Sequence, residues 1–238
     1  MNPIALALCL FALGAQDQKP AAPRPNPALV PVSRTDDWAI QRQNEVLRRA
    51  RASEKAAVVF VGDSITQGWE GEGAALWQKE LAPLGALNLG VSGDRTEHVL
   101  WRLREAPLTH LEPRVVVLLI GTNNLGHGTS NAEETAAGVL AVIAELHAQA
   151  PQATLLVHEI FPRGERMNPM RGDLLQVNQV LRAHALSPKT RVLGFSDRWV
   201  REDGTIPKEI MPDFLHLSPA GYAQWTEALV PEIRAALK

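Results

Sequence analysis

Short apolar runs recur along the chain, and amphipathic stretches separate them. The runs at 57–61 and 114–120 are apolar almost throughout and show no alternation with polar residues. Such a run is typical of a parallel strand that is buried on both faces. Three further runs of this kind predict strands at 86–89, 154–160 and 190–195.

The stretches between the expected strands carry helix signals. Asp94 with Glu97, and Asn131 with Glu134, have the spacing of a capping box, and Pro219 suits the first position of a last helix. Strands that alternate with helices favour a parallel sheet covered on both faces. We therefore predict an α/β fold: a single doubly wound, flavodoxin-like, three-layer domain with a five-stranded parallel sheet.

A first helix is expected ahead of the first strand, at 36–52. Its apolar positions recur at helical spacing, which predicts that they pack against the sheet. These positions are Trp38, Ile40, Val46 and Leu47.

The chain up to residue 34 has a different composition. An apolar core over 4–13, followed by small and polar residues, predicts a signal peptide over 1–15. No Lys or Arg precedes this core, so two locations stay open: secreted or periplasmic if the signal is real, and cytoplasmic otherwise. The core is too short to cross a bilayer, so no transmembrane segment is expected. Closely spaced prolines indicate a linker over 16–34, which leaves 35–238 as the folded domain.

Composition excludes several classes of protein. The formal net charge of −2 over 238 residues gives no electrostatic basis for binding nucleic acid or an anionic membrane. Cys9 is the only cysteine, which excludes intrachain disulfides and thiolate metal sites. The spacing of His98, His127 and His158 is not typical of metal ligands, so surface or supporting positions are expected for them and no metal site is predicted.

The end of the first expected strand is the first candidate for chemistry. Gly62 breaks the run at 57–61, and Ser64 follows at the start of the next helix. Ligands of open α/β sheets bind beyond the carboxyl ends of the strands, where Ser64 would be a useful nucleophile. A serine in this place is more commonly only a helix N-cap, so Ser64 alone decides nothing.

Other strand ends offer partners for Ser64. The spacing of Asp213 and His216 lets the carboxylate orient the imidazole, which makes an acyl-transfer triad possible. The N–H of Gly93 and the amide of Asn123 are suitable donors to an oxyanion. Each residue also has an ordinary structural explanation, since glycine permits a turn and asparagine closes one. Their joint occurrence at successive strand ends favours a catalytic site.

These residues resemble the four sequence blocks of the SGNH (GDSL-type) hydrolases, which here are Gly62-Asp63-Ser64, Gly93, Gly121-Thr122-Asn123-Asn124 and Asp213-Phe214-Leu215-His216. Further stretches resemble the catalytic subunits of the platelet-activating-factor acetylhydrolase branch; they are 88–94, 97–103, 161–164 and 216–222. The resemblance runs from about residue 36 to the C-terminus. The first block alone is weak evidence, whereas four blocks in order at suitable spacing are strong evidence.

The resemblance implies a role for each residue. Ser64 is the expected nucleophile, His216 its base and Asp213 the carboxylate that orients the base. The expected oxyanion donors are the N–H groups of Ser64 and Gly93 and the side chain of Asn123. Neither a metal nor any other cofactor is required.

Two positions depart from the family pattern. Asn124 stands where the third block usually ends in Asp, a departure that the acetylhydrolase branch shares. Ser92 stands where that branch commonly has Gly, beside the expected acyl pocket. Neither position carries one of the expected catalytic roles.

We expect a serine esterase that hydrolyses short-chain esters, acetyl esters first, through an acyl-enzyme intermediate. The substrate would be a small-molecule acyl ester, either an acetylated carbohydrate or a lipid. A phospholipase or thioesterase is the alternative among enzymes. A non-catalytic binding module should have lost Ser64 or His216, and a nucleotide binder would not place Asp63 against a phosphate. The oligomeric state stays open, with a homodimer among the options.

Overall fold

A computed structural model describes residues 24–184 and 187–238 of the chain. Five parallel strands form one sheet in the order β2-β1-β3-β4-β5. This order is that of flavodoxin-like doubly wound folds, so the predicted fold class is confirmed. The strands are β1 (Val58–Gly62), β2 (Ala86–Asn88), β3 (Val115–Leu119), β4 (Thr154–His158) and β5 (Thr190–Leu193).

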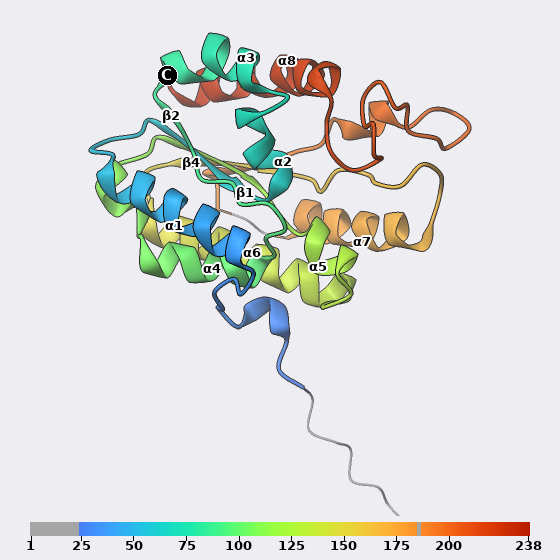
Figure 1. Cartoon of the computed structure of the whole chain (residues 1–238), viewed down its shortest axis with the longest axis horizontal. Helices are drawn as coiled ribbons and strands as arrows, with labels where there is room; N and C mark the ends of the chain where they lie inside the picture. Colours follow the sequence, from blue (N-terminus) through green and yellow to red (C-terminus); the bar gives the residue numbers. More distant parts are fainter. Residues whose placement is uncertain (1–23, 185–186) are drawn as a thin grey trace, which may run out of the picture.

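Helices cover both faces of this sheet (Figure 1). Side chains of α1, α4, α6 and α7 share one apolar cluster with one face, and those of α2 and α8 share a second cluster with the other. The helices are α1 (Asp37–Ala52), α2 (Ser64–Gln67), α3 (Ala74–Leu76), α4 (Thr96–Glu105), α5 (Thr122–Gly126), α6 (Ala132–Gln149), α7 (Pro169–Ala183) and α8 (Pro219–Ala236).

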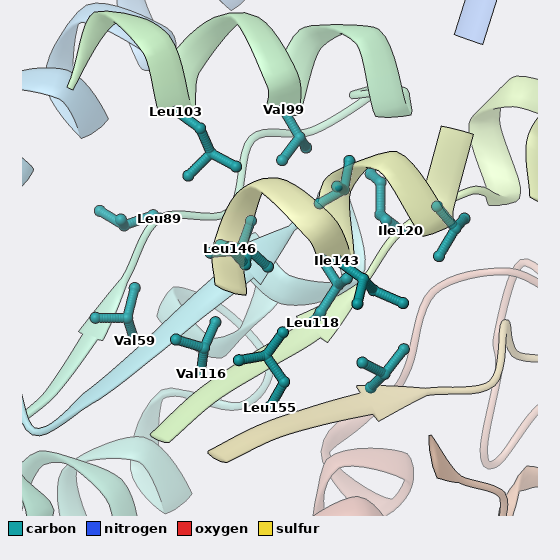
Figure 2. Packing of buried hydrophobic residues seen from close by; sticks show 14 of the residues in the cluster. Val59, Leu89, Val99, Leu103, Val116, Leu118, Ile120, Ile143, Leu146 and Leu155 are labelled. Atoms are coloured by element: carbon teal, nitrogen blue, oxygen red, sulfur yellow. The ribbon is translucent and has the colours of Figure 1, made fainter. Parts of the chain in front are cut away.

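The central strand β3 has no exposed face. Val116 and Leu118 lie in the cluster beneath α4 and α6, where Figure 2 shows them beside Ile143 and Leu146. Val117 belongs to the cluster on the opposite face. Burying one such aliphatic side chain contributes about 1.5–3 kcal/mol, so the uninterrupted apolar run fixes β3 in the middle of the three layers.

The fourth strand is shorter than the predicted run at 154–160, because it ends at His158. Two residues later, the Ile160 N–H donates to Asn178 Oδ1 (2.8 Å) and the Ile160 carbonyl accepts from Asn178 Nδ2 (3.0 Å). An α7 side chain therefore takes the place of a neighbouring strand. The chain leaves the sheet there and starts the loop that leads to α7.

The first helix lies where it was predicted, and Val46 and Leu47 are buried. Ile40 is half-buried. The prediction for Trp38 was wrong, because its side chain is 53% exposed. Its ring instead stacks under the Arg34 guanidinium, 5.1 Å from the ring centroid, which helical periodicity alone does not reveal.

The predicted signal peptide over 1–15 lies outside the described residues. Within the expected linker, Ala28 is fully buried, and its carbonyl accepts from Thr96 Oγ1 (2.9 Å). Asn26 Nδ2 donates to the carbonyl of Glu134 (3.1 Å) at the start of α6. The described end of the Pro-rich segment therefore packs on the domain. Across residues 24–184 and 187–238, no helix has the length and apolar character that a membrane crossing requires.

Candidate active site

Ser64 is the first residue of the short helix α2, directly beyond the carboxyl end of β1. Asp63 caps this helix, since its Oδ1 accepts the N–H of Ile65 (3.0 Å). A Cβ on Gly62 would lie 2.4 Å from the carbonyl oxygen of Leu119, so only glycine fits here. The turn that presents Ser64 is therefore set by close packing of β1 against β3.

The structure brings Ser64, His216 and Asp213 together. Ser64 Oγ lies 2.9 Å from His216 Nε2, and His216 Nδ1 lies 2.6 Å from Asp213 Oδ2. Because a carboxylate only accepts, His216 Nδ1–H donates to Asp213, and Nε2 accepts from the Ser64 hydroxyl. Residues 152 positions apart in the sequence thus form one continuous hydrogen-bonded chain.

The turn before α8 holds His216 through Asp213. Asp213 Oδ1 accepts the N–H groups of Leu215 (3.0 Å) and His216 (2.7 Å), and Phe214 has a left-handed φ of 61°. Partial burial alone would raise the pKa of Asp213, but hydrogen bonds from the His216 side chain and from this backbone outweigh it and lower that pKa. Asp213 therefore stays ionised beside the imidazole.

Two further strand ends, those of β2 and β3, lie along the same edge of the sheet as α2 (Figure 1). Asn123 is buried on α5, and its Nδ2 donates to the carbonyl of Asp94 (2.9 Å), which leaves one amide hydrogen for a ligand. Ser92 N–H donates to Gln67 Oε1 (2.8 Å), which fixes the loop containing Gly93. Within the described residues, the N–H groups of Ser64 and Gly93 make no hydrogen bond.

Asp94 does not cap α4, so that prediction was wrong. The residue is fully buried and pairs with the guanidinium groups of Arg34 (3.3 Å) and Arg102. The helix begins at Thr96, whose N–H donates to Asn124 Oδ1 (3.0 Å). Asp94 is instead the charged centre of the loop that carries Gly93. The capping box predicted at Asn131 and the last helix predicted to begin with Pro219 are both present.

The contacts of Asn124 explain why this position departs from the family pattern. Its side chain is fully buried, and its Nδ2 donates to Glu97 Oε2 (3.0 Å). An aspartate at this position would press a second carboxylate against Glu97, which is costly in a buried site. The amide therefore suits the acidic residue that α4 supplies.

Asp63, next to Ser64, is fully buried. Burial raises the pKa of Asp63 to about 7, and the N–H of Ile65 and the charge of Arg163 only partly oppose this effect. Its Oδ2 has no hydrogen-bond partner among the described residues. A carboxyl group that ionises less readily than an exposed aspartate therefore adjoins the proposed nucleophile.

The three histidines that were considered as metal ligands, His98, His127 and His158, lie in different environments. His98 Nδ1 accepts the N–H of Arg95 (3.0 Å), and His158 Nε2 accepts from Trp225 Nε1–H (3.0 Å). Burial lowers the pKa of both His98 and His158 to about 3, so both are neutral. His127 is exposed. Over residues 24–184 and 187–238, no group of His, Cys, Asp or Glu side chains has the arrangement of a metal site.

A cleft of about 710 Å³ lies between α7 and residues 197–204. Its apolar lining includes Ile160, Met167, Leu174 and Leu175. The side chain of Asn178, which also lines it, is fully engaged with the backbone of Ile160. The surface that this cleft offers a ligand is mainly apolar, and charged residues that also line it are Arg171, Asp197, Arg201 and Glu202.

A model of the GDSL-like Lipase/Acylhydrolase family matches residues 60–224, a range that includes Ser64, Gly93, Asn123, Asp213 and His216. The chain belongs to this family. It is 38% identical over 208 residues to platelet-activating factor acetylhydrolase IB subunit alpha1 of Homo sapiens, which covers 86% of this chain and 88% of that one. It is 37% identical over 207 residues to the alpha2 subunit of Rattus norvegicus, covering 84% and 86%.

Solved structures of GDSL-type proteins share the fold. A GDSL-like lipase from Bacteroides thetaiotaomicron has a TM-score of 0.69 at 20% identity and covers 82% of this chain and 98% of its own. An acetylxylan esterase from Geobacillus stearothermophilus has a TM-score of 0.59 at 20% identity and covers 76% and 95%. At this level of identity these two structures support the fold alone. Family membership, together with the named relatives, makes this chain a carboxylic ester hydrolase.

Several supporting residues had no clear sequence signal. Arg34 lies in the segment assigned to the linker, and nothing in its neighbourhood marks it as a partner of Asp94. Arg163 and Asn124 belong to recognisable stretches, but their contacts depend on loops that meet only in the folded chain. A search for buried charged residues near the four sequence blocks could have found Asp94 but not its partners.

Proposed function

We propose that the protein is a serine esterase in which Ser64, His216 and Asp213 act as a catalytic triad. The observation that carries this proposal is the continuous chain of hydrogen bonds from Ser64 Oγ through the imidazole to Asp213 Oδ2. A non-catalytic module on this scaffold has no need for such a chain. The hydrogen bonds support the roles of Ser64 as nucleophile, His216 as base and Asp213 as the carboxylate that orients the base.

In the first half of the reaction, Ser64 Oγ forms a bond to the ester carbonyl carbon while His216 Nε2 takes the hydroxyl proton. The imidazolium stays paired with Asp213, whose lowered pKa keeps it ionised. His216 then passes the proton to the oxygen of the departing alcohol as the carbon–oxygen bond breaks. The acyl group is left on Ser64.

In the second half, water attacks the acyl-enzyme while His216 takes one of its protons. That proton returns to Ser64 Oγ as the carboxylic acid leaves, so the enzyme is regenerated. In both halves the carbonyl oxygen carries a developing negative charge. The N–H groups of Ser64 and Gly93 and the second amide hydrogen of Asn123 would stabilise this charge, and each would lower the barrier by roughly 3–4 kcal/mol.

For the substrate we propose a short-chain ester, with acetate as the preferred acyl group. The curated relatives support this choice, because they are named acetylhydrolases of platelet-activating factor. The acetylxylan esterase, which shares the fold, supplies a carbohydrate ester for comparison. Those names span a lipid and a carbohydrate, so the alcohol portion is the open variable. Hydrolysis of acetylated xylo-oligosaccharides and of acetylated glycerolipids distinguishes the two.

A phospholipase or thioesterase that accepts long acyl chains is the second candidate. One observation favours it: the mainly apolar cleft of about 710 Å³ beside α7, which Ile160 and Pro162 of the loop after β4 help to line. Rates with p-nitrophenyl esters of increasing chain length decide between the two. A maximum at acetate supports the first candidate, and a maximum at eight carbons or more supports the second.

The test of the triad is the change Ser64→Ala. We expect kcat for p-nitrophenyl acetate to fall at least roughly 10,000-fold, because the nucleophile is lost. The thermal midpoint should change by less than about 2 °C, since the Ser64 side chain is only half-buried. Substantial activity in a well-folded Ser64→Ala protein would contradict the assignment.

Export is proposed only through the predicted signal peptide over 1–15. Expression of the full chain in a bacterial host, followed by N-terminal sequencing of the periplasmic fraction, tests it. Cleavage after Ala15 supports export, and recovery of the uncleaved chain from the cytoplasm contradicts it.

A further inference from the structure

Arg163 connects the loop after β4 to the turn that carries Asn123. Its Nη1 donates to Thr122 Oγ1 (3.1 Å) and to the Thr122 carbonyl oxygen (3.3 Å). Thr122 is the first residue of α5 and directly precedes Asn123. One guanidinium nitrogen therefore holds both the side chain and the backbone of the residue that starts this turn.

Gly126 provides the space for this contact. A Cβ at position 126 would lie 2.5 Å from Arg163 Nη1. The backbone of Gly126 is not in the left-handed region, so no conformational reason demands glycine there. The absence of a side chain on the last turn of α5 is what lets the guanidinium rest against that helix.

The same loop is fixed at its other side. The Arg163 carbonyl accepts from Arg171 Nε (3.0 Å), and the N–H of Gly164 donates to the carbonyl of Phe214 (2.8 Å). Phe214 lies between Asp213 and His216. The loop thus joins the turn that holds the imidazole to the turn that holds Asn123.

The charge of Arg163 is not neutralised locally. The side chain is half-buried, yet within the described residues no carboxylate lies within ion-pairing distance of it. Burial lowers the pKa of Arg163, and the more distant charges of Asp63 and Asp213 oppose that effect. A half-buried guanidinium costs solvation free energy, so its place against Thr122 calls for a functional explanation.

We propose that Arg163 is a positioning residue that holds the first turn of α5, so that the Asn123 amide faces the oxyanion formed at Ser64. This inference rests on the proposed function, because it concerns the oxyanion donor of that mechanism. Arg163 acts through Thr122 and does not touch the substrate.

The first test is the change Arg163→Met, which keeps the length of the stem and removes the guanidinium. We expect kcat for p-nitrophenyl acetate to fall about 10- to 100-fold, because a displacement of about 1 Å in a catalytic group has effects of this size. KM should change less than about threefold. Arg166→Met is the matched control, because Arg166 is an exposed arginine of the same loop, and its kcat should stay unchanged.

Gly126→Ala tests the same contact without touching Arg163. The added methyl meets only the flexible end of the arginine, which can swing away, and alanine favours the helix more than glycine does. We therefore expect the thermal midpoint to hold or rise while kcat falls in the same direction as in Arg163→Met. A purely structural role for Arg163 predicts no such separation of stability from turnover.

The double variant Arg163→Met with Asn123→Ala completes the cycle. If Arg163 acts through Asn123, the double variant should be no more than about threefold slower than Asn123→Ala alone. Fully additive losses, or a raised KM with normal kcat in Arg163→Met, would overturn the proposal. Either outcome leaves the loss in Ser64→Ala intact, so a failure here is distinguishable from a failure of the triad.

Discussion

The two halves of the proposed catalytic site are built in opposite ways. On the nucleophile side, Asp63 and Asn124 are fully buried and Asn123 is 5% exposed, and side chains from several loops hold one another. On the base side, the side chains of His216 and Asp213 are 45% and 56% exposed, and they are held by hydrogen bonds within one short turn. Substitutions of these buried residues on the nucleophile side should therefore change stability, whereas those on the base side should change activity almost alone.

The largest effect is expected on the base side, from Asp213→Asn. The asparagine oxygen can still accept the N–H groups of Leu215 and His216, so the thermal midpoint should change little. The neutral amide no longer stabilises the imidazolium. An amide nitrogen that faces His216 Nδ1 also favours the tautomer whose Nε2 carries the proton and cannot accept one from Ser64. We therefore expect kcat to fall about 10,000-fold. Steady-state kinetics and thermal melts measure both quantities. A loss of less than about tenfold would show that Asp213 does not orient the base.

On the nucleophile side, Asn123→Ala should lower kcat roughly 100- to 1,000-fold with little change in KM, because its amide would act on the transition state only. Asn124→Ala is the comparison. It leaves the buried Thr96 N–H without its acceptor and removes one of the hydrogen bonds to the Glu97 carboxylate, so we expect a loss of about 1–3 kcal/mol of unfolding free energy. Its kcat, measured well below the melting transition, should fall far less. Equal losses of kcat would mean that the oxyanion donor is misplaced.

Asp63→Asn should raise stability, and the gain should depend on pH. The pKa of Asp63 is raised from 3.8 to about 7 by burial, so between these values the unfolded chain loses a proton that the folded chain keeps. Stability of the parent protein therefore falls as pH rises from about 4 to about 7. The asparagine variant lacks this fall, so its advantage grows over that interval and then levels off.

The size of that advantage is on the order of 4 kcal/mol at pH 8, taking about 1.4 kcal/mol per pKa unit. Urea denaturation of both proteins at pH 5 and pH 8 measures it. An advantage that is equal at the two pH values would show that Asp63 is ionised in the folded protein throughout.

The smallest effect is expected from metal removal. Neither half of the site contains a cluster of ligands among the described residues, and the proposed mechanism uses only protein groups. Activity toward p-nitrophenyl acetate should therefore be unchanged after dialysis against EDTA. A loss that zinc or calcium reverses would favour a metal-dependent hydrolase instead.

Much of this architecture was predictable because its causes are local. The unbroken apolar run of β3 indicated a buried strand, and Asp213 and His216 could be paired because they are three positions apart. The Asn131 capping box is likewise complete within four residues. In each case the sequence contains both partners of the interaction.

The parts that could not be predicted depend on partners that are distant in the sequence. Asp94 has the spacing of a helix cap, yet it pairs with Arg34, 60 positions earlier. Arg163 reaches Thr122, 41 positions earlier. Trp38 occupies an apolar position of its helix, yet its side chain is exposed. The order of the strands in the sheet determines which loops are neighbours at its edge. The spacing of residues along the sequence does not reveal that order.

The double use of Asp213 has a consequence for protein engineering. The same carboxylate that orients His216 also closes the turn from Asp213 to His216 through its backbone hydrogen bonds. The imidazole and the turn that orients it therefore both belong to one tetrapeptide just before a helix. Such a segment can be transferred as a unit: placed ahead of a helix in another α/β scaffold, it should keep its imidazole oriented. The nucleophile side is assembled from separate loops, so no single segment of it can be transferred in this way.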